Sequence, residues 1–361
     1  MKTKLLKIFL LLGVLYSVNP NTQSKEILIL ISIPLLIFLI TDKNTYKKIP
    51  PLPYAIAFIF LINGIYNQLY NSSMRNIVFM LGTMAIIKNI SYKKSLNYFF
   101  WVILMYIGLV FINININPEH IVEYKYIGNF VIKRRIYLNM HYSGLALNFL
   151  LLYFICEIKK KSFFIKFISI FGMLFLGKLS PILTIFLVEL INYFGWEKGL
   201  LKKGVNLKIM IVFFNILPFF LLAILNYANE EILKLFTKRD LLYKNSYQIF
   251  KDYGFIEKMI GKGDIDYAVA PFTYHPHNQF LHILLMFGLL GFIGFLFMNL
   301  KIADNLLENK DTKEKKIYFK LLLALLIIMQ LDDYLVWSVF SVIQLVYYKL
   351  YCGSKNKIRR I

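Results

Sequence analysis

Histidine side chains suited to acid–base chemistry gather ahead of one apolar stretch of this 361-residue chain. His275 and His277 flank a proline, and the apolar stretch begins directly after them. Histidine is the side chain whose unperturbed pKa suits a general base near neutral pH. The pair lacks the i, i+4 spacing of helical zinc ligands, so we expect no metal site. Proton transfer is the chemical interpretation, and histidines that only cap a helix or lie at an interface are the alternative.

Arginine is rare in this chain, so its positions are informative. The sequence holds 36 lysines and 6 arginines. Arg239 lies in a predicted amphipathic helix over 230–253, within its aromatic stripe, while Arg134 and Arg135 precede His141. A planar guanidinium matches two phosphate oxygens at once, which a lysine ammonium does not. These arginines are candidate ligands of a lipid-linked phosphate, and snorkelling to ordinary lipid headgroups is the alternative.

Recurring apolar runs decide the class of protein to which these residues belong. The chain is 58% hydrophobic, with a mean hydropathy of +0.59. Runs near 20 residues match the length that crosses about 30 Å of hydrocarbon. We therefore predict an all-α polytopic membrane protein. The net charge of +22 is explained by lysines in short cytoplasmic loops, so nucleic acid is not an expected partner.

Twelve transmembrane helices are predicted from these runs. They cover 4–19, 26–41, 51–67, 75–88, 97–114, 137–156, 163–177, 180–195, 209–227, 278–300, 317–331 and 334–352. The first range resembles a signal peptide but no small-x-small cleavage pattern follows, so we interpret it as a retained helix. The inner connections carry 28 lysine and arginine residues and the outer ones 14, which predicts that both termini are cytoplasmic.

Two outer segments are longer than connections need to be. The first covers 113–136, and the second covers about 228–276 and is the longest hydrophilic stretch. Long loops of this kind are usually functional. The chain is thus predicted to be one integral membrane domain in three parts. Residues 1–227 hold helices one to nine, 228–277 form the large extracytoplasmic loop, and 278–361 hold helices ten to twelve and a basic cytoplasmic tail.

Two features inside the predicted helices invite structural interpretations. Gly288, Gly291 and Gly294 recur every three residues. Small residues let transmembrane helices approach closely, so helix packing is favoured for them. Glu189 is the carboxylate deepest inside a predicted segment. Such a residue is a functional candidate, and a hydrogen bond across a helix pair is the alternative.

One local motif resembles a known family. The stretch 277–281, His-Asn-Gln-Phe-Leu, followed by Gly-Leu-Leu-Gly over 288–291, resembles the signature of the bacterial O-antigen ligase and O-antigen or capsule polymerase superfamily. Gly261-Lys262-Gly263 resembles the Gly-x-Gly of that family, and Arg239-Asp240 resembles its arginine early in the large loop. The resemblance covers roughly 236–294, and the rest of the chain agrees in layout.

This resemblance implies a GT-C-like fold and a metal-independent glycosyltransferase that uses no cofactor. Such enzymes join glycans carried on undecaprenyl diphosphate at the outer face of the bacterial inner (cytoplasmic) membrane. It implies His277 as the base or orienting group for an acceptor hydroxyl, and Arg239 as a ligand of the donor diphosphate. The further residues expected to contact substrate are Arg134, Arg135, His275, Asn278, Lys262, His141 and Tyr243.

The leading hypothesis is a polymerase that joins oligosaccharide repeat units into a surface polysaccharide, either O-antigen or capsule. Its expected partners are lipid-linked oligosaccharides, the bilayer, a chain-length regulator and a flippase. One alternative is the ligase that moves finished glycan to an acceptor such as lipid A core. Another is a flippase or transporter of lipid-linked oligosaccharide. A transporter places polar residues inside its helices along a central path, whereas this chain places them in outer loops and at helix mouths.

Overall fold

The computed structural model describes most of the chain after its first two predicted segments. The described residues are 49–88, 90–116, 120–127, 130–137, 142–159, 162–202, 204–227, 239–263, 278–309, 311–331 and 342–353. Predicted helices 4–19 and 26–41 lie outside this part, as do His141, His275 and His277.

Each of the remaining predicted segments overlaps a helix of the described part, although the bounds differ. These helices are α4 Pro51–Tyr66, α5 Tyr70–Lys88, α6 Tyr92–Ile116, α7 Tyr142–Ile155, α8 Ser162–Phe175, α9 Leu179–Tyr193, α11 Gly204–Tyr227, α15 Gln279–Glu308, α16 Thr312–Leu331 and α18 Val342–Cys352. Shorter helical elements are η2 Cys156–Ile158, α10 Trp196–Lys202, α13 Arg239–Asp252 and α14 Phe255–Ile260. A helix satisfies its own backbone hydrogen bonds, which is why long apolar runs adopt it.

Length and composition allow three described helices to cross a membrane. They are Tyr92–Ile116, Gly204–Ile224 and Gln279–Glu308, and α9 with α10 makes a fourth if that pair, bent by 76°, is counted as one span. Shorter apolar helices occupy Pro51–Tyr66, Ile77–Lys88, Gly144–Ile158 and Ser162–Phe175. This arrangement is consistent with the predicted helical membrane protein. The count of twelve spans stays a prediction.

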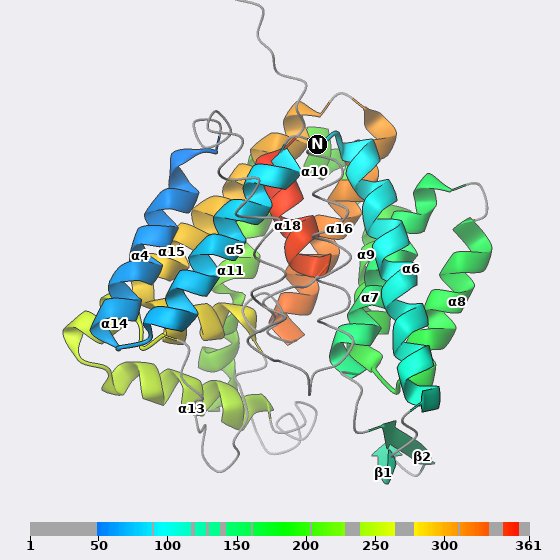
Figure 1. Cartoon of the computed structure of the whole chain (residues 1–361), viewed down its shortest axis with the longest axis horizontal. Coiled ribbons are helices and arrows are strands. Elements are labelled where there is room, and N and C mark those ends of the chain that lie inside the picture. The colour runs from blue at the N-terminus through cyan, green and yellow to red at the C-terminus, as the bar shows by residue number, and fades with distance from the viewer. Residues whose placement is uncertain are drawn as a thin grey trace, which may run out of the picture.

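The helices alternate in direction between two ends of the molecule (Figure 1). Asn278, just before α15, hydrogen-bonds to Gln330 at the close of α16. At the opposite end, Asn305 of α15 donates to the carbonyl of Leu350 in α18 at 3.2 Å. In Figure 1, α13 and α14 lie at the lower left and the two strands at the lower right of one end, and α10 lies at the opposite end. We refer to these as the α13 end and the α10 end.

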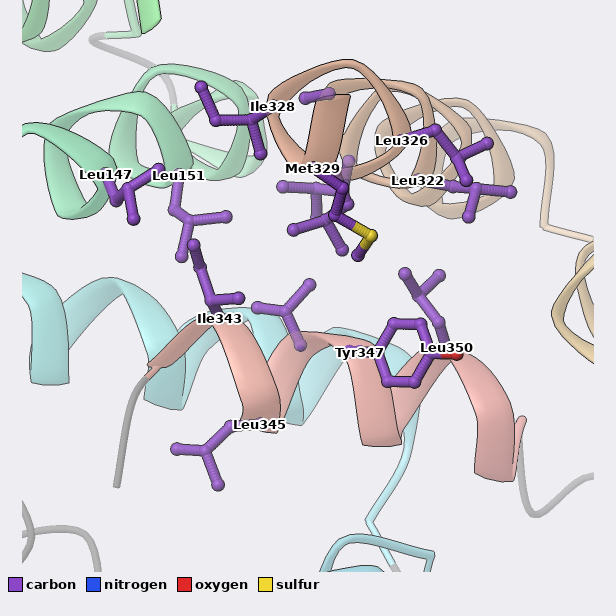
Figure 2. Close-up of a cluster of buried hydrophobic side chains, with 14 of the residues drawn as sticks. Leu147, Leu151, Leu322, Leu326, Ile328, Met329, Ile343, Leu345, Tyr347 and Leu350 are labelled. Carbon is purple, nitrogen blue, oxygen red and sulfur yellow. The ribbon is translucent and has the colours of Figure 1, made fainter. Parts of the chain in front are cut away.

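Part of the hydrophobic core lies where α7, α16 and α18 meet (Figure 2). The side chains labelled there are Leu147, Leu151, Leu322, Leu326, Ile328, Met329, Ile343, Leu345, Tyr347 and Leu350, and all of them are buried. Every residue of α16 over 317–330 is buried, as expected for a helix that is apolar on all sides. By contrast, α8 lies at the edge, where Phe163 is 85% exposed and Phe171 is 63% exposed.

The first outer segment contains a two-stranded antiparallel sheet that the all-α prediction did not include. Strand β1 His120–Ile127 pairs with β2 Phe130–Tyr137, and Glu123 lies opposite Arg134 in the register. The predicted helix 137–156 was therefore too long at its start, because Tyr137 ends β2 and α7 begins at Tyr142. Two runs rich in β-branched and aromatic residues around a Gly-Asn pair are a hairpin pattern. The chain is mainly helical, with this one hairpin in its described part.

Candidate functional site

A buried set of hydrogen bonds joins three helices at the α13 end. The Tyr243 hydroxyl of α13 donates to the backbone carbonyl oxygen of Gln330 at 2.7 Å. Nδ2 of Asn278 donates to the same carbonyl at 3.2 Å and to the Tyr243 hydroxyl oxygen at 3.2 Å. Gln330 is the next-to-last residue of α16, where helix carbonyls lack partners within the helix. Tyr243 and Asn278 are 3% and 0% exposed, so this contact holds α13 against the start of α15.

Asn278 also starts α15 with the other atom of its amide. Its backbone is extended, and its Oδ1 accepts from the backbone N–H groups of Phe280 at 3.0 Å and Leu281 at 3.1 Å. Asparagine is among the preferred residues at this capping position because it satisfies N–H groups that lack a helical partner. One side chain therefore caps the helix with its oxygen and ties the helix to α13 and α16 with its nitrogen.

The Gly-x-x-Gly stretch of α15 contains a break in the helix. Gly288 has φ 63° and ψ −165°, which is not helical. A break deprives the preceding carbonyls of partners in the next turn. The loop after α14 supplies them, because Lys262 N donates to the Leu285 carbonyl at 3.1 Å and Gly263 N donates to the Met286 carbonyl at 2.9 Å. Two pieces of the family-like motif, Gly261-Lys262-Gly263 and Gly288, thus meet backbone to backbone.

This contact is too close to admit side chains at its glycines. A Cβ on Gly261 would lie 2.2 Å from the carbonyl carbon of Met286, and one on Gly288 would lie 2.5 Å from that of Met259. Both glycines have φ near +70°, a conformation that other residues rarely adopt. The packing role predicted for Gly288 is therefore met by the end of α14, and Gly294 packs against Ile56 of α4.

Asn63 of α4 and Asn67, the residue directly after that helix, complete this junction, and sequence reasoning did not single them out. Nδ2 of Asn63 lies 2.6 Å from the Ile260 carbonyl, 3.1 Å from that of Gly261 and 2.9 Å from that of Met286. Nδ2 of Asn67 donates to the Gly261 carbonyl at 3.2 Å. The sequence feature that could have indicated them is their spacing of i, i+4, which places two polar residues on one face of the otherwise apolar predicted helix 51–67.

Lys262 presents the positive charge of this loop to the surroundings. Its side chain is 37% exposed, and its Nζ lies 3.4 Å from Oε1 of Glu257. The ammonium also lies 4.8 Å from the centroid of the Tyr253 ring. Lys262 is therefore oriented by a carboxylate and an aromatic ring at the edge of the molecule. A phosphate bound there would compete with Glu257 for the ammonium.

The remaining predicted site residues are placed only in part. Arg239 is the first residue of α13, and Arg134 and Arg135 belong to β2, but the side chains of all three lie outside the described residues. The hairpin that holds Arg134 and Arg135 lies at the α13 end (Figure 1). Among the predicted residues whose side chains are described, Tyr243 and Asn278 contact each other. Their direct contact with substrate stays a prediction.

Glu189 belongs to a different cluster, nearer the α10 end. Lys320 donates to both carboxylate oxygens of Glu189 at 3.1 Å and to Oε1 of Glu157 at 2.9 Å. Lys166 donates to Glu157 at 2.7 Å. Two carboxylates and two ammonium groups thus balance one another across α8, α9, α16 and η2. Of the two interpretations of Glu189, hydrogen bonding between helices is the one that its contacts support.

Within the described ranges, no group of three or more histidine, cysteine, aspartate or glutamate side chains is arranged to hold a metal ion. His141, His275 and His277 lie outside those ranges, so the expectation that the site uses no metal stays a prediction.

No protein family, no curated protein and no solved structure matches this chain. The family resemblance therefore depends on the motif over 236–294 itself. What the structure adds is the arrangement of that motif, whose described pieces contact one another at the α13 end.

Proposed function

We propose that this chain is a membrane glycosyltransferase that polymerises undecaprenyl-diphosphate-linked oligosaccharide repeat units into a surface polysaccharide. In this proposal the chain has about twelve spans in a GT-C-like arrangement, with both termini in the cytoplasm. The α13 end then faces outward from the inner membrane, where lipid-linked glycans are polymerised.

One observation carries the proposal: the separated pieces of the motif contact one another. Tyr243, one helical turn after Arg239, is hydrogen-bonded to Asn278, the residue after His277. The glycine loop at 261–263 is hydrogen-bonded to the α15 segment just before Gly288. A motif that resembles a family only by chance has no reason to assemble in this way. The assembly supports one site built from the large loop and the mouth of α15.

The proposed reaction replaces one bond at a sugar carbon by another. The hydroxyl oxygen of an acceptor sugar attacks the anomeric carbon of the donor glycan, and its proton passes to His277. The bond from that carbon to the diphosphate oxygen breaks, and undecaprenyl diphosphate leaves with the electron pair. His277 suits this step because imidazole accepts a proton near neutral pH.

Arg239 has the complementary role at the leaving group. Negative charge develops on the diphosphate as its bond to the sugar breaks. A fixed guanidinium stabilises that charge in the transition state and needs no metal ion to do so. Arg134 and Arg135 from β2, together with Lys262, are the other cations proposed for the diphosphate.

The test is reconstitution of the purified full-length chain in lipid vesicles with undecaprenyl-diphosphate-linked repeat units. A gel ladder of lengthened glycan is the expected product. Transfer of preformed polymer to lipid A core, without lengthening, would instead identify the ligase. Movement of the lipid-linked glycan across the bilayer with no new glycosidic bond would identify a flippase and overturn the proposal. Chelator added in excess should leave the ladder unchanged.

A further inference from the structure

The connection between α9 and α10 turns the chain sharply at the α10 end. The two helices are bent by 76° relative to each other. Gly195 lies at the bend with φ 69°, and its N–H donates to the Asn192 carbonyl at 3.0 Å. If α9 runs across the membrane, a helix at this angle to it runs almost along the membrane surface.

Aromatic side chains cover the outside of this bend. Tyr193, Phe194 and Trp196 are 83%, 56% and 62% exposed. Phe194 stacks on Trp196 with 5.6 Å between ring centroids, and Tyr193 packs edge-on against Phe194 at the same distance. Tyrosine and tryptophan concentrate at the boundary between hydrocarbon and headgroups, because their rings are apolar and their N–H or O–H groups are polar. The cluster therefore has the composition of a membrane boundary.

The acidic side chain of α10 faces the protein, and two of its basic side chains face outward. Glu197 is buried, and its Oε2 lies 3.3 Å from Nζ of Lys316 in α16. Lys198 and Lys202, spaced i, i+4 and thus on one face, are both exposed. The acidic side chain thus holds α10 to the protein, while the basic ones are free to meet an anionic surface.

We infer that the bend formed by the end of α9 and α10 binds anionic phospholipid headgroups. The aromatic cluster lies at the edge of the hydrocarbon, and Lys198 and Lys202 contact the phosphates. Anionic lipid is the occupant that fits, because exposed lysines beside exposed aromatic rings match a charged headgroup above an apolar layer. This inference does not depend on the proposed enzymatic function.

The first measurement is the depth of Trp196 in the bilayer. The full chain carrying Trp101→Phe and Trp337→Phe keeps Trp196 as its one tryptophan. In nanodiscs of phosphatidylglycerol, bromine placed near the glycerol end of the acyl chains should quench its emission more than bromine near the methyl end. Strong quenching by aqueous acrylamide with no quenching by brominated lipid would overturn the inference and leave this surface to a soluble partner.

The second measurement tests the lysines in mixed nanodiscs. Trp196 emission is followed while phosphatidylglycerol replaces phosphatidylcholine. In the double variant Lys198→Gln with Lys202→Gln, we expect the same change in Trp196 emission to require at least about fivefold more phosphatidylglycerol than in the protein with both lysines. The matched control is Lys93→Gln with Lys94→Gln, which removes the same charge from exposed positions at the start of α6. Trp196 emission that is the same in phosphatidylglycerol and phosphatidylcholine would overturn the inference. An equal loss of the emission change in the double variant at 198 and 202 and in the control at 93 and 94 would also overturn it.

Discussion

The hydroxyl oxygen of Tyr243 lies 3.2 Å from the side-chain nitrogen of Asn278, with both side chains buried. This contact joins the large loop to the mouth of α15. Arg239 precedes Tyr243 by one helical turn, and His277 directly precedes Asn278. A small displacement at this contact would therefore be transmitted to both residues that we propose for catalysis.

Tyr243→Phe should weaken this junction without abolishing it. The change removes the hydroxyl that donates to Gln330, while Asn278 still donates to the same carbonyl. Loss of such a hydrogen bond costs about 0.5–1.5 kcal/mol, so we expect a slightly lower unfolding temperature and a several-fold slower polymerisation rate. Tyr247→Phe is the control, because Tyr247 lies one turn further along α13 and is 49% exposed. Equal effects of the two changes would contradict a positioning role for Tyr243.

Arg239→Lys should impair polymerisation nearly as much as Arg239→Ala. Lysine keeps the charge but lacks the planar pair of donors that contacts two phosphate oxygens. We expect a rate about 10²–10³-fold lower for either variant, measured as glycan lengthening in vesicles. Lys251→Ala removes a cation from the last turn of the same helix and should leave the rate unchanged. Full activity of Arg239→Lys would reduce the role of Arg239 to its charge.

His277→Ala should leave single repeat units on the lipid carrier and no polymer. The reason is that the acceptor hydroxyl loses the base that takes its proton. His120→Ala, a change in β1 outside the motif, is the control and should give a normal ladder. Gel analysis of glycan made by each purified variant, at matched amounts of folded protein, distinguishes them. Long chains made by His277→Ala would remove this residue from catalysis.

Gly288→Ala should strongly reduce the amount of folded protein. The positive-φ, extended backbone at Gly288 costs about 1–3 kcal/mol with a side chain, and the new Cβ would lie 2.5 Å from the Met259 carbonyl carbon. Gly108→Ala is the matched control in α6, where a Cβ meets nothing within 4 Å. Size-exclusion yield and unfolding temperature in detergent provide the comparison. Equal stability of the two variants would mean that α15 is not broken at Gly288.

The sequence predicted the positions of the described helices well, because each depends on a long apolar run. It did not predict the hairpin formed by β1 and β2, because a short alternating pattern is a weaker signal than a long apolar run. It also missed α14 Phe255–Ile260, which is a short helix started by the Glu257 carboxylate accepting from the Gly254 N–H.

The sequence singled out Tyr243 and Asn278 as candidate residues, but it did not predict the contact between them. Gly288 was expected to allow helix packing, which is confirmed, but its partner, the backbone of α14 at Met259, was not predicted. Asn63 was not singled out because its partners, Gly261 and Met286, lie about 200 residues away in sequence. Such distant pairings depend on how helices assemble, which local pattern does not encode.

Lys320→Met should destabilise the protein because it leaves Glu157 and Glu189 with only one ammonium partner. The Lys320 side chain is 4% exposed, and removing one member of a buried ion pair costs about 3–5 kcal/mol. We expect the lower part of that range, because the two carboxylates are 19% and 28% exposed and water screens them. Lys208→Met is the control, since the bridge from Lys208 to Asp304 is exposed and should contribute less than about 1 kcal/mol.

Adding Glu189→Gln to Lys320→Met separates a purely structural role of this cluster from a role in the polymerisation reaction. The double variant removes one charge of each sign and leaves Glu157 paired with Lys166, so its unfolding temperature should recover much of the loss. If the cluster only holds α9 and α16 together, the recovered protein should also lengthen glycan at close to the normal rate. A double variant that is stable but does not lengthen glycan would make the Lys320–Glu189 pair part of the working machinery, as charged residues inside membrane helices often are.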